Sequence, residues 1–373
     1  MNKYLNGTIL EMLERVKTLK TKIPSDVPDC FHQLAANCTN EIDNIILNLE
    51  AFIGNPKYQV PSNLSRKLID FQEEVRYIDY LENKIVACVH RCNGDDVKVT
   101  KLIQKVCKEI GYPLIPPVAS RLSQEYYCID TKFNHMRVPL LESEFLLHMP
   151  DLYHELAHPI IAVSNDPRVV KFQESLIQFI DFADNYCQTE IATYRKNNGD
   201  EQADSLELFS RSWVKWAIEF CCDLFAAYTL GPAYAWANLH LCLKRGSNPF
   251  DTPLYLPSSH PADDARMQTI LIGLELIGFK NEAKEINTQW QKYVSLSGGS
   301  IDANFKLAYP RHVLEHCASL ALQGTKAIKG NIANSGSQGE VGSLLNEAWR
   351  KFIDDPLNYV GWEKLQRDKY DVL

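Results

Sequence analysis

Residues 154 to 158 read His-Glu-Leu-Ala-His, and this pentapeptide constrains the fold more than any other stretch of the chain. Positions four apart lie on one face of an α-helix, so a helix here brings His154 and His158 to a common point. Two neutral imidazoles in that arrangement form a pair of Zn²⁺ ligands. Glu155 between them can polarise a metal-bound water and take its proton. The alternative is an amphipathic helix that matches the pattern by chance.

The flanks of the pentapeptide favour the metal site. They are apolar at Leu156, Ala157, Ile160 and Ile161, so we expect the helix to be buried. Buried histidines and a buried glutamate need partners, and a metal supplies them. We predict that this helix begins at Ser143 or Pro150 and ends at Val163.

Composition is that of an ordinary globular protein, with 45% hydrophobic and 23% charged residues. The 373 residues can bury one large core or two to three smaller ones. The net charge of −8 and the lack of a basic run argue against nucleic acid as the main partner. No stretch approaches the roughly 20 apolar residues of a membrane span. The 11 scattered cysteines and the lack of a signal-peptide core predict reduced thiols and a cytoplasmic location.

Residues 1–112 carry apolar residues at helical spacing only. The longest of these patterns, from Leu64 to Val89, is in near-heptad order. We predict an N-terminal helical bundle here, which could bind a protein partner. Three prolines between Pro113 and Pro117 suggest a linker, after which the period changes.

The next segment predicts a β-hairpin directly before the histidine-bearing helix. Residues 125–130 and 136–140 are rich in Tyr, Ile and Val, and residues 132–134 suit a turn. An edge strand beside a metal site can pair with an extended peptide and hold it across the site.

A third metal ligand has to come from further along the chain. Catalytic zinc usually keeps three protein ligands and an open position for water. The extended motif with a third histidine fails, because Ile161 and Ser164 occupy its positions. The acidic candidates are Glu174, Glu190, Glu201, Glu207 and Glu219.

Glu219 is favoured by its context. It lies in the predicted helix 206–230, which is apolar almost all round, and Asp223 follows one turn later. A buried carboxylate pair is unfavourable unless a cation and hydrogen-bond donors compensate. The metal could take Glu219, while Asp223 accepts the outer N–H of a ligand histidine. A salt bridge on the helix face is the alternative.

Residues 259–267 add His260 and Arg266, which could both point back to these carboxylates. The order H-E-x-x-H, E-x-x-x-D and H-P-x-x-x-x-R resembles the gluzincin metallopeptidases. It is most similar to the CAAX prenyl protease and HtpX-type group and its soluble minigluzincin relatives, over about residues 125–275. The resemblance implies the following roles: His154, His158 and Glu219 bind zinc, Glu155 is the catalytic base, and Asp223 supports the ligands.

Some features depart from that group. His158 and Glu219 are 61 positions apart, the membrane spans are missing, and Cys221 and Cys222 precede Asp223 where a small residue is common. These differences leave the subfamily and the substrate open. Whether a partner must open the groove, and the oligomeric state, are equally open.

The predicted fold is mainly α with a small β-hairpin or sheet, a zincin-like core flanked by helical bundles. The predicted domains are the bundle (1–112), a catalytic domain (113–300) and a C-terminal helical segment (301–373) with a mobile loop at 330–343. Further helices are predicted at 262–277, 280–296 and 303–328 and around Trp349 and Trp362.

Two functions fit this pattern. The first is a soluble zinc peptidase: Glu155 deprotonates a metal-bound water that attacks a peptide carbonyl, and then passes the proton to the leaving amine. His260 and Tyr234 are candidates to stabilise the oxyanion, although His260 could equally be a structural hydrogen-bonding partner. The second is a latent or non-enzymatic zinc-binding scaffold that acts through its helical bundle. The intact Glu155 argues against it, because a structural zinc needs no base.

Overall fold

The computed structural model describes residues 1–373 except 124–125, 164–165, 247, 335–337 and 371–373. The described chain is mainly helical with one small three-stranded sheet, which confirms the predicted class in this general form. No helix in the described part is long and apolar enough to span a membrane.

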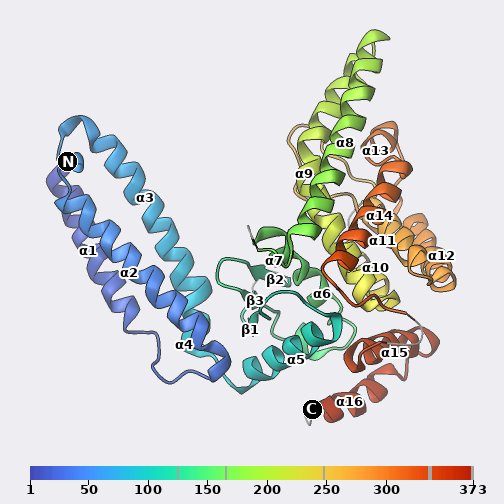
Figure 1. Cartoon of the computed structure of the whole chain (residues 1–373), viewed down its shortest axis with the longest axis horizontal. Coiled ribbons are helices and arrows are strands. Elements are labelled where there is room, and N and C mark those ends of the chain that lie inside the picture. Colours follow the sequence, from blue (N-terminus) through green and yellow to red (C-terminus); the bar gives the residue numbers. More distant parts are fainter. Residues whose placement is uncertain (124–125, 164–165, 247, 335–337, 371–373) are drawn as a thin grey trace.

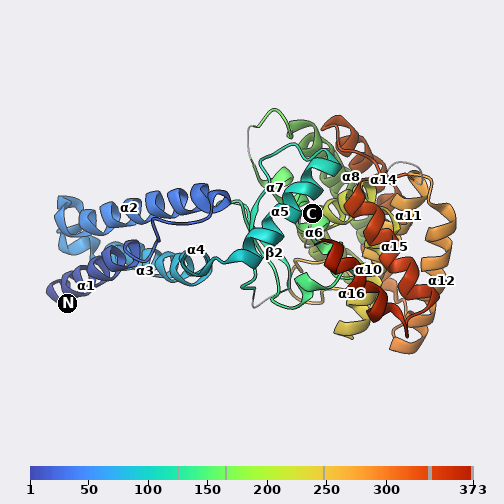
Figure 2. The same ribbon diagram turned by 90° about the horizontal axis from the view of Figure 1, so that it is seen from below.

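The N-terminal helices form a bundle that extends away from the rest of the molecule in both views (Figures 1 and 2). Its core contains the apolar residues that recur at helical spacing, among them Ile9, Val16, Ile42, Leu49 and Ile78. The predicted near-heptad helix is one continuous helical stretch with a π-helical segment in it. The elements are α1 (Asn2–Lys20), η1 (Asp29–Phe31), α2 (His32–Gly54), η2 (Pro56–Tyr58), η3 (Pro61–Asn63), α3 (Leu64–Tyr80), η4 (Leu81–Val86) and α4 (Ala87–Arg91).

Helix α5 (Gly94–Ile110) connects the bundle to the rest of the chain. Asn93 caps its first turn by accepting from the backbone N–H groups of Asp95 and Asp96. Gly111, at φ 67°, ends it in the left-handed conformation that favours glycine. The fully buried apolar residues of α5 pack into the second core, while the partly buried Val97 packs against that of the bundle.

The sheet has the order β1-β3-β2. Strands β2 (Cys128–Asp130) and β3 (His135–Arg137) are antiparallel, so the predicted hairpin is confirmed with shorter strands; residue 125 of its predicted first strand lies outside the described residues. Strand β1 (Val118–Ser120) pairs with β3 in parallel and was not predicted, because it follows directly on the proline-rich segment.

The helix that carries the histidines is broken. It consists of α6 (Asp151–Glu155) and α7 (Ala157–Ala162), which meet at Leu156. Pro159 has no N–H to donate to the carbonyl of Glu155, so a straight helix loses one bond at this point. The prediction of one continuous helix was therefore wrong. The start at Ser143 was also wrong, since Ser143 belongs to a separate turn, η5 (Glu142–Glu144).

Helices α8 (Val170–Lys196) and α9 (Asp200–Leu230) form a long hairpin (Figure 1). The end of α9 is fully buried, as its composition predicts. Helix α10 (Pro232–Arg245) follows at once and was not predicted, because Gly231-Pro232 was interpreted only as a stop. Proline is in fact favourable at the first position of a helix, where its missing N–H has no partner to lose.

The remaining helices pack around α9. Tyr228 of α9 donates to the carbonyl of Ala318 at 2.6 Å. Gly273, in the helix Asp263–Leu276, has no side chain, so this helix approaches Leu224 of α9 closely. The predicted helix 303–328 is interrupted before Pro310, and the predicted loop 330–343 gives way to a helix at Glu340. The elements are α11 (Asp263–Leu276), α12 (Lys280–Ser297), α13 (Ala303–Ala308), α14 (Arg311–Ala327), α15 (Glu340–Asp354) and α16 (Tyr359–Tyr370).

Candidate metal centre

His154 lies at the centre of a group of polar side chains from four helices. Its Nδ1 is 2.9 Å from Oδ1 of Asp223, and its Nε2 is 3.5 Å from Oε2 of Glu219. Two ligand atoms that are each about 2 Å from one tetrahedral zinc lie roughly 3.3 Å apart. The contact between His154 and Glu219 therefore has the separation of two ligands of a common metal, and Asp223 occupies the outer nitrogen of the imidazole.

His158 faces a residue that the sequence analysis did not single out as a ligand. Its Nδ1 is 3.6 Å from Sγ of Cys222, and the ligand atoms of His154, His158 and Cys222 all lie within 4.8 Å of one another. A sulfur and a nitrogen bound to one zinc lie roughly 3.5 Å apart. Two residues of α9 therefore lie near the histidines: Cys222 is within reach of both of them, and Glu219 is within reach of His154.

Asp223 is fully buried and is the best-connected carboxylate of the centre. Arg266 donates to it twice, from Nε at 2.8 Å and from Nη2 at 2.6 Å, and the hydroxyl of Tyr234 donates at 2.5 Å. Burial opposes ionisation of Asp223, but Arg266 and His154 outweigh this and lower its pKa well below the usual range. The carboxylate is therefore held charged against the imidazole of His154.

The two histidines differ in their electrostatics. Burial alone would lower the pKa of His154, but its contacts with Asp223 and Glu219 raise it to about 10. Burial, aided by the charge of His154, lowers the pKa of His158 to about 4. A cation bound between them would take the place of the proton on His154, because metal ligands must be deprotonated.

Glu155 is partly buried at the cavity wall. Burial raises its pKa to about 7, and the neighbouring Glu219 and Asp151 add to the rise. Its carboxylate accepts a hydrogen bond from the backbone N–H of Ile129 in β2. The edge strand of the sheet therefore lies directly beside this glutamate, where a carboxylate titrating near neutral pH can act as a base.

A cavity of about 120 Å³ opens onto these groups. His260 lies at its exposed side, with Nε2 3.9 Å from Oε2 of Glu219. The hydroxyl of Tyr234, the other candidate for oxyanion stabilisation, already donates to Asp223. The lining residues are Tyr126, Tyr127, Asp151, His154, Glu155, Glu219, Tyr234, Asn238, Leu241, Arg245, His260 and Arg266.

Two of the other acidic candidates lie elsewhere. Glu174 pairs with Lys171 and Glu207 with Arg195, all in exposed or partly exposed ion pairs. The sequence signal that separated Glu219 from them was its position among apolar residues.

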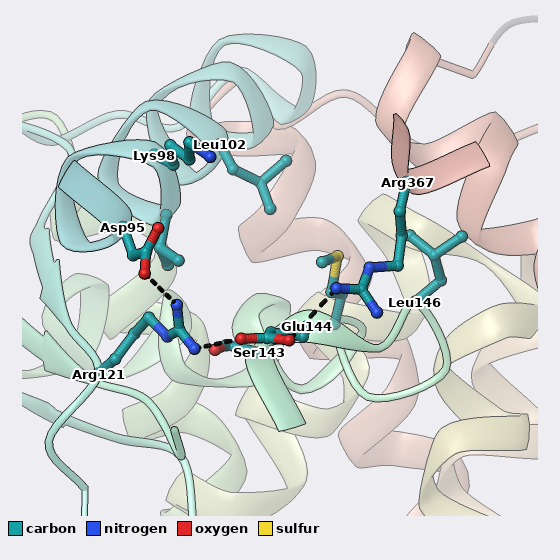
Figure 3. Close-up of a pocket in the computed structure, with 10 residues that line it drawn as sticks. Asp95, Lys98, Leu102, Arg121, Ser143, Glu144, Leu146 and Arg367 are labelled. Carbon is teal, nitrogen blue, oxygen red and sulfur yellow. Dashed lines mark hydrogen bonds and ion pairs between the residues drawn. The ribbon is translucent and has the colours of Figure 1, made fainter. Parts of the chain in front are cut away.

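A larger cavity of about 230 Å³ lies between α5, the segment around η5 and the last helix (Figure 3). Arg121 pairs there with Asp95 and Glu144, and Arg367 of α16 pairs with Glu144 (Figure 3). Because these charges neutralise one another, we interpret the cavity as part of the docking of α16, and not as a second reactive site.

No protein-family model, curated protein or solved structure matches this chain. What can be said of its function therefore rests on the geometry described above.

Proposed function

We propose that the protein is a zinc-dependent peptidase with His154, His158 and Glu219 as metal ligands. The observation that carries the proposal is the 3.5 Å separation between Nε2 of His154 and Oε2 of Glu219, with Asp223 on the other nitrogen of the ring. Such a carboxylate on the outer nitrogen fixes the orientation of a metal-binding histidine and raises its basicity.

Zinc bound here would supply an activated water and polarise the carbonyl of the substrate. Glu155 would be the base for such a water and would pass the proton to the leaving amine. His260 stands on the exposed side of the cavity, where it can donate to the developing oxyanion. The edge strand β2, which contacts Glu155, offers its backbone to an extended peptide.

We assign Cys222 the role of orienting His158. It faces Nδ1 of His158 just as Asp223 faces Nδ1 of His154, which leaves the Nε2 atoms of both rings for the metal. In this arrangement zinc has three protein ligands and one open position, as catalytic sites require.

Metal content tests the ligand set. We expect one zinc per chain, by elemental analysis of the purified protein. Glu219→Ala should lose most of it, whereas the matched change Glu207→Ala, in the same helix but in a surface ion pair, should retain it. A protein that neither contains zinc nor takes it up would refute the proposal.

Glu155→Gln tests the chemistry. The amide has nearly the same shape but cannot accept the proton, so zinc and fold should be retained while hydrolysis of casein, an unstructured protein substrate, falls by about 10²–10⁴-fold. Full activity of this variant would remove Glu155 from the mechanism.

The position of Cys222 also favours a second candidate, a latent zinc protein. If Cys222 binds zinc together with the two histidines and Glu219, four protein ligands close the site as in structural zinc centres. Cobalt substitution separates the two arrangements. A sulfur-to-cobalt charge-transfer band that disappears in Cys222→Ser indicates the closed site, and its absence in the wild-type protein indicates the open one.

A further inference from the structure

One face of α10 forms a wall of the zinc cavity. Tyr234, Asn238, Leu241 and Arg245 follow one another at spacings of four, three and four, so they share one face of the helix, and all four line the cavity. Tyr234 is tied to the metal centre through Asp223. The other three lead away from the centre toward the surface.

Asn238 carries a buried amide donor. Its residue is only 4% exposed, and within the described part of the chain its Nδ2 has no hydrogen-bond acceptor. A buried amide donor that lacks a partner is unfavourable by roughly one ordinary hydrogen bond or more. An acceptor that enters the cavity would satisfy it.

Arg245 is an exposed cation at the outer end of this face. Its guanidinium stacks on the ring of Tyr126 at 5.6 Å, and the hydroxyl of Tyr126 donates to Asp151 at 2.6 Å. Among the described residues, no carboxylate forms an ion pair with Arg245, whereas the other arginine that lines the cavity, Arg266, is paired with Asp223. The stacking holds the guanidinium at the cavity without neutralising it.

We infer that this face of α10 selects substrates that carry a carboxylate near the cleaved bond. The seven helical steps from Asn238 to Arg245 span about 10 Å, which is the length of about three residues of extended peptide. Asn238 donates to a backbone carbonyl close to the reacting bond, Leu241 contacts apolar groups, and Arg245 binds the carboxylate about three residues away. The carboxylate belongs to an acidic side chain or to the C-terminus of the peptide.

The inference rests on the proposed function for the nature of the ligand, so its first test requires no turnover. Zinc-loaded Glu155→Gln is titrated with amidated alanine-leucine hexapeptides in which a single Glu is moved through each position, and with the same set carrying Gln. A further Gln peptide with a free C-terminus completes the series. A charged hydrogen bond at a partly exposed site is worth about 3- to 10-fold in affinity, which is the expected preference for the acidic peptides.

Variants assign the preference to its residue. Arg245→Gln should remove the preference for acidic peptides, and Arg245→Glu should reverse it toward peptides with Lys. The control is Lys244→Gln, because Lys244 is the adjacent cation and does not line the cavity. This variant should keep the preference unchanged. If the amidated Glu peptides bind more tightly than their Gln counterparts, the recognised carboxylate belongs to a side chain. If only the Gln peptide with a free C-terminus binds more tightly, the recognised carboxylate is that of the C-terminus. Equal binding of acidic and neutral peptides, or an unchanged preference in Arg245→Glu, overturns the inference.

Cleavage of a peptide mixture from digested casein, mapped by mass spectrometry, separates this inference from the proposed function. Cleavage with no carboxylate at a fixed distance of about three residues overturns the inference and leaves the peptidase in place. Carboxylate-dependent binding without any cleavage overturns the peptidase and supports the carboxylate site.

Discussion

The N-terminal bundle and the core around α9 are both helical, yet different interactions organise their centres. In the bundle, apolar residues at helical spacing form one seam, and Arg15 makes ion pairs at the surface with Asp79 and Glu82. Around α9, Asp223 lies fully buried with partners from three other helices. An apolar seam can be predicted from the sequence of each helix separately, because it requires only apolar residues at helical spacing. A buried charge needs partners that only the folded chain brings together.

The largest effect should come from removing the centre of the charged cluster. Asp223→Ala leaves Arg266 buried without its partner, which typically lowers the free energy of unfolding by about 3–5 kcal/mol. Urea unfolding of the metal-free protein measures this. The double variant Asp223→Ala/Arg266→Met should lose less than the single one, because no unpaired charge remains. An equal or larger loss in the double variant would show that the charges are not coupled.

An apolar change in the bundle should have an effect of similar or smaller size and of a different kind. Leu49→Ala removes a fully buried side chain of α2 and should cost about 3 kcal/mol. Hydrogen exchange should report faster opening of α1 to α3, with zinc affinity unchanged. Leu47→Ala, at a position 63% exposed on the same helix, is the matched control. Weaker zinc binding in Leu49→Ala would show that the two regions do not respond independently.

The sheet joins the two regions, since Phe133 packs in the first core and Met136 in the second. Between them His135 is fully buried, and burial together with Arg137 lowers its pKa from 6.5 to about 3. The unfolded chain therefore takes up a proton below pH 6.5 that the folded protein excludes. Stability from neutral His135 is present above pH 6.5 and is lost as the pH falls, by about 2 kcal/mol between pH 7 and pH 5.

His135→Gln should flatten this dependence, as unfolding free energies at pH 7, 6 and 5 would show. The comparison is made between wild type and variant, so that other titrating groups cancel. Parallel curves for the two proteins would indicate that His135 does not contribute.

The smallest effect is expected at the surface of the bundle. Arg15 and Glu82 are 2.6 Å apart, with both side chains 39% exposed. Glu82→Gln should change the free energy of unfolding by less than about 1 kcal/mol, and by less still at high salt. A larger loss would mean that the surface network contributes as buried pairs do.

The same contrast explains what could be predicted from the sequence. Periodicity predicted the bundle helices and the part of α9 from residue 206 on, and turn residues predicted the hairpin. Helix α10 was missed because its first residue, Pro232, was interpreted as a terminator. With it, Asn238 and Arg245 were missed as parts of the proposed binding surface.

In the candidate site, spacing related His154 to His158 and Glu219 to Asp223, but it could not relate the two pairs to each other. The sequence pattern placed a ligand histidine and Arg266 near Asp223, and His154 and Arg266 contact it in the structure. The proximity of Cys222 to His158 was missed, because it depends on where α7 begins after Leu156 and on how α7 packs against α9. Neither leaves a signal in a single segment.

The α8–α9 hairpin has a consequence for how relatives of this protein could be recognised. Most of the 60 residues between His158 and Glu219 run out along α8 and back along α9, whose first residue, Asp200, lies about 28 Å from Glu219 along the helix axis. Because seven residues make almost two whole turns, deleting seven from each arm near the tip would keep both helix faces in register. The number of residues between the two motifs could thus change in this way without moving the proposed metal centre. A search for related chains should therefore allow any number of residues in this gap and require only the short motifs at its two ends.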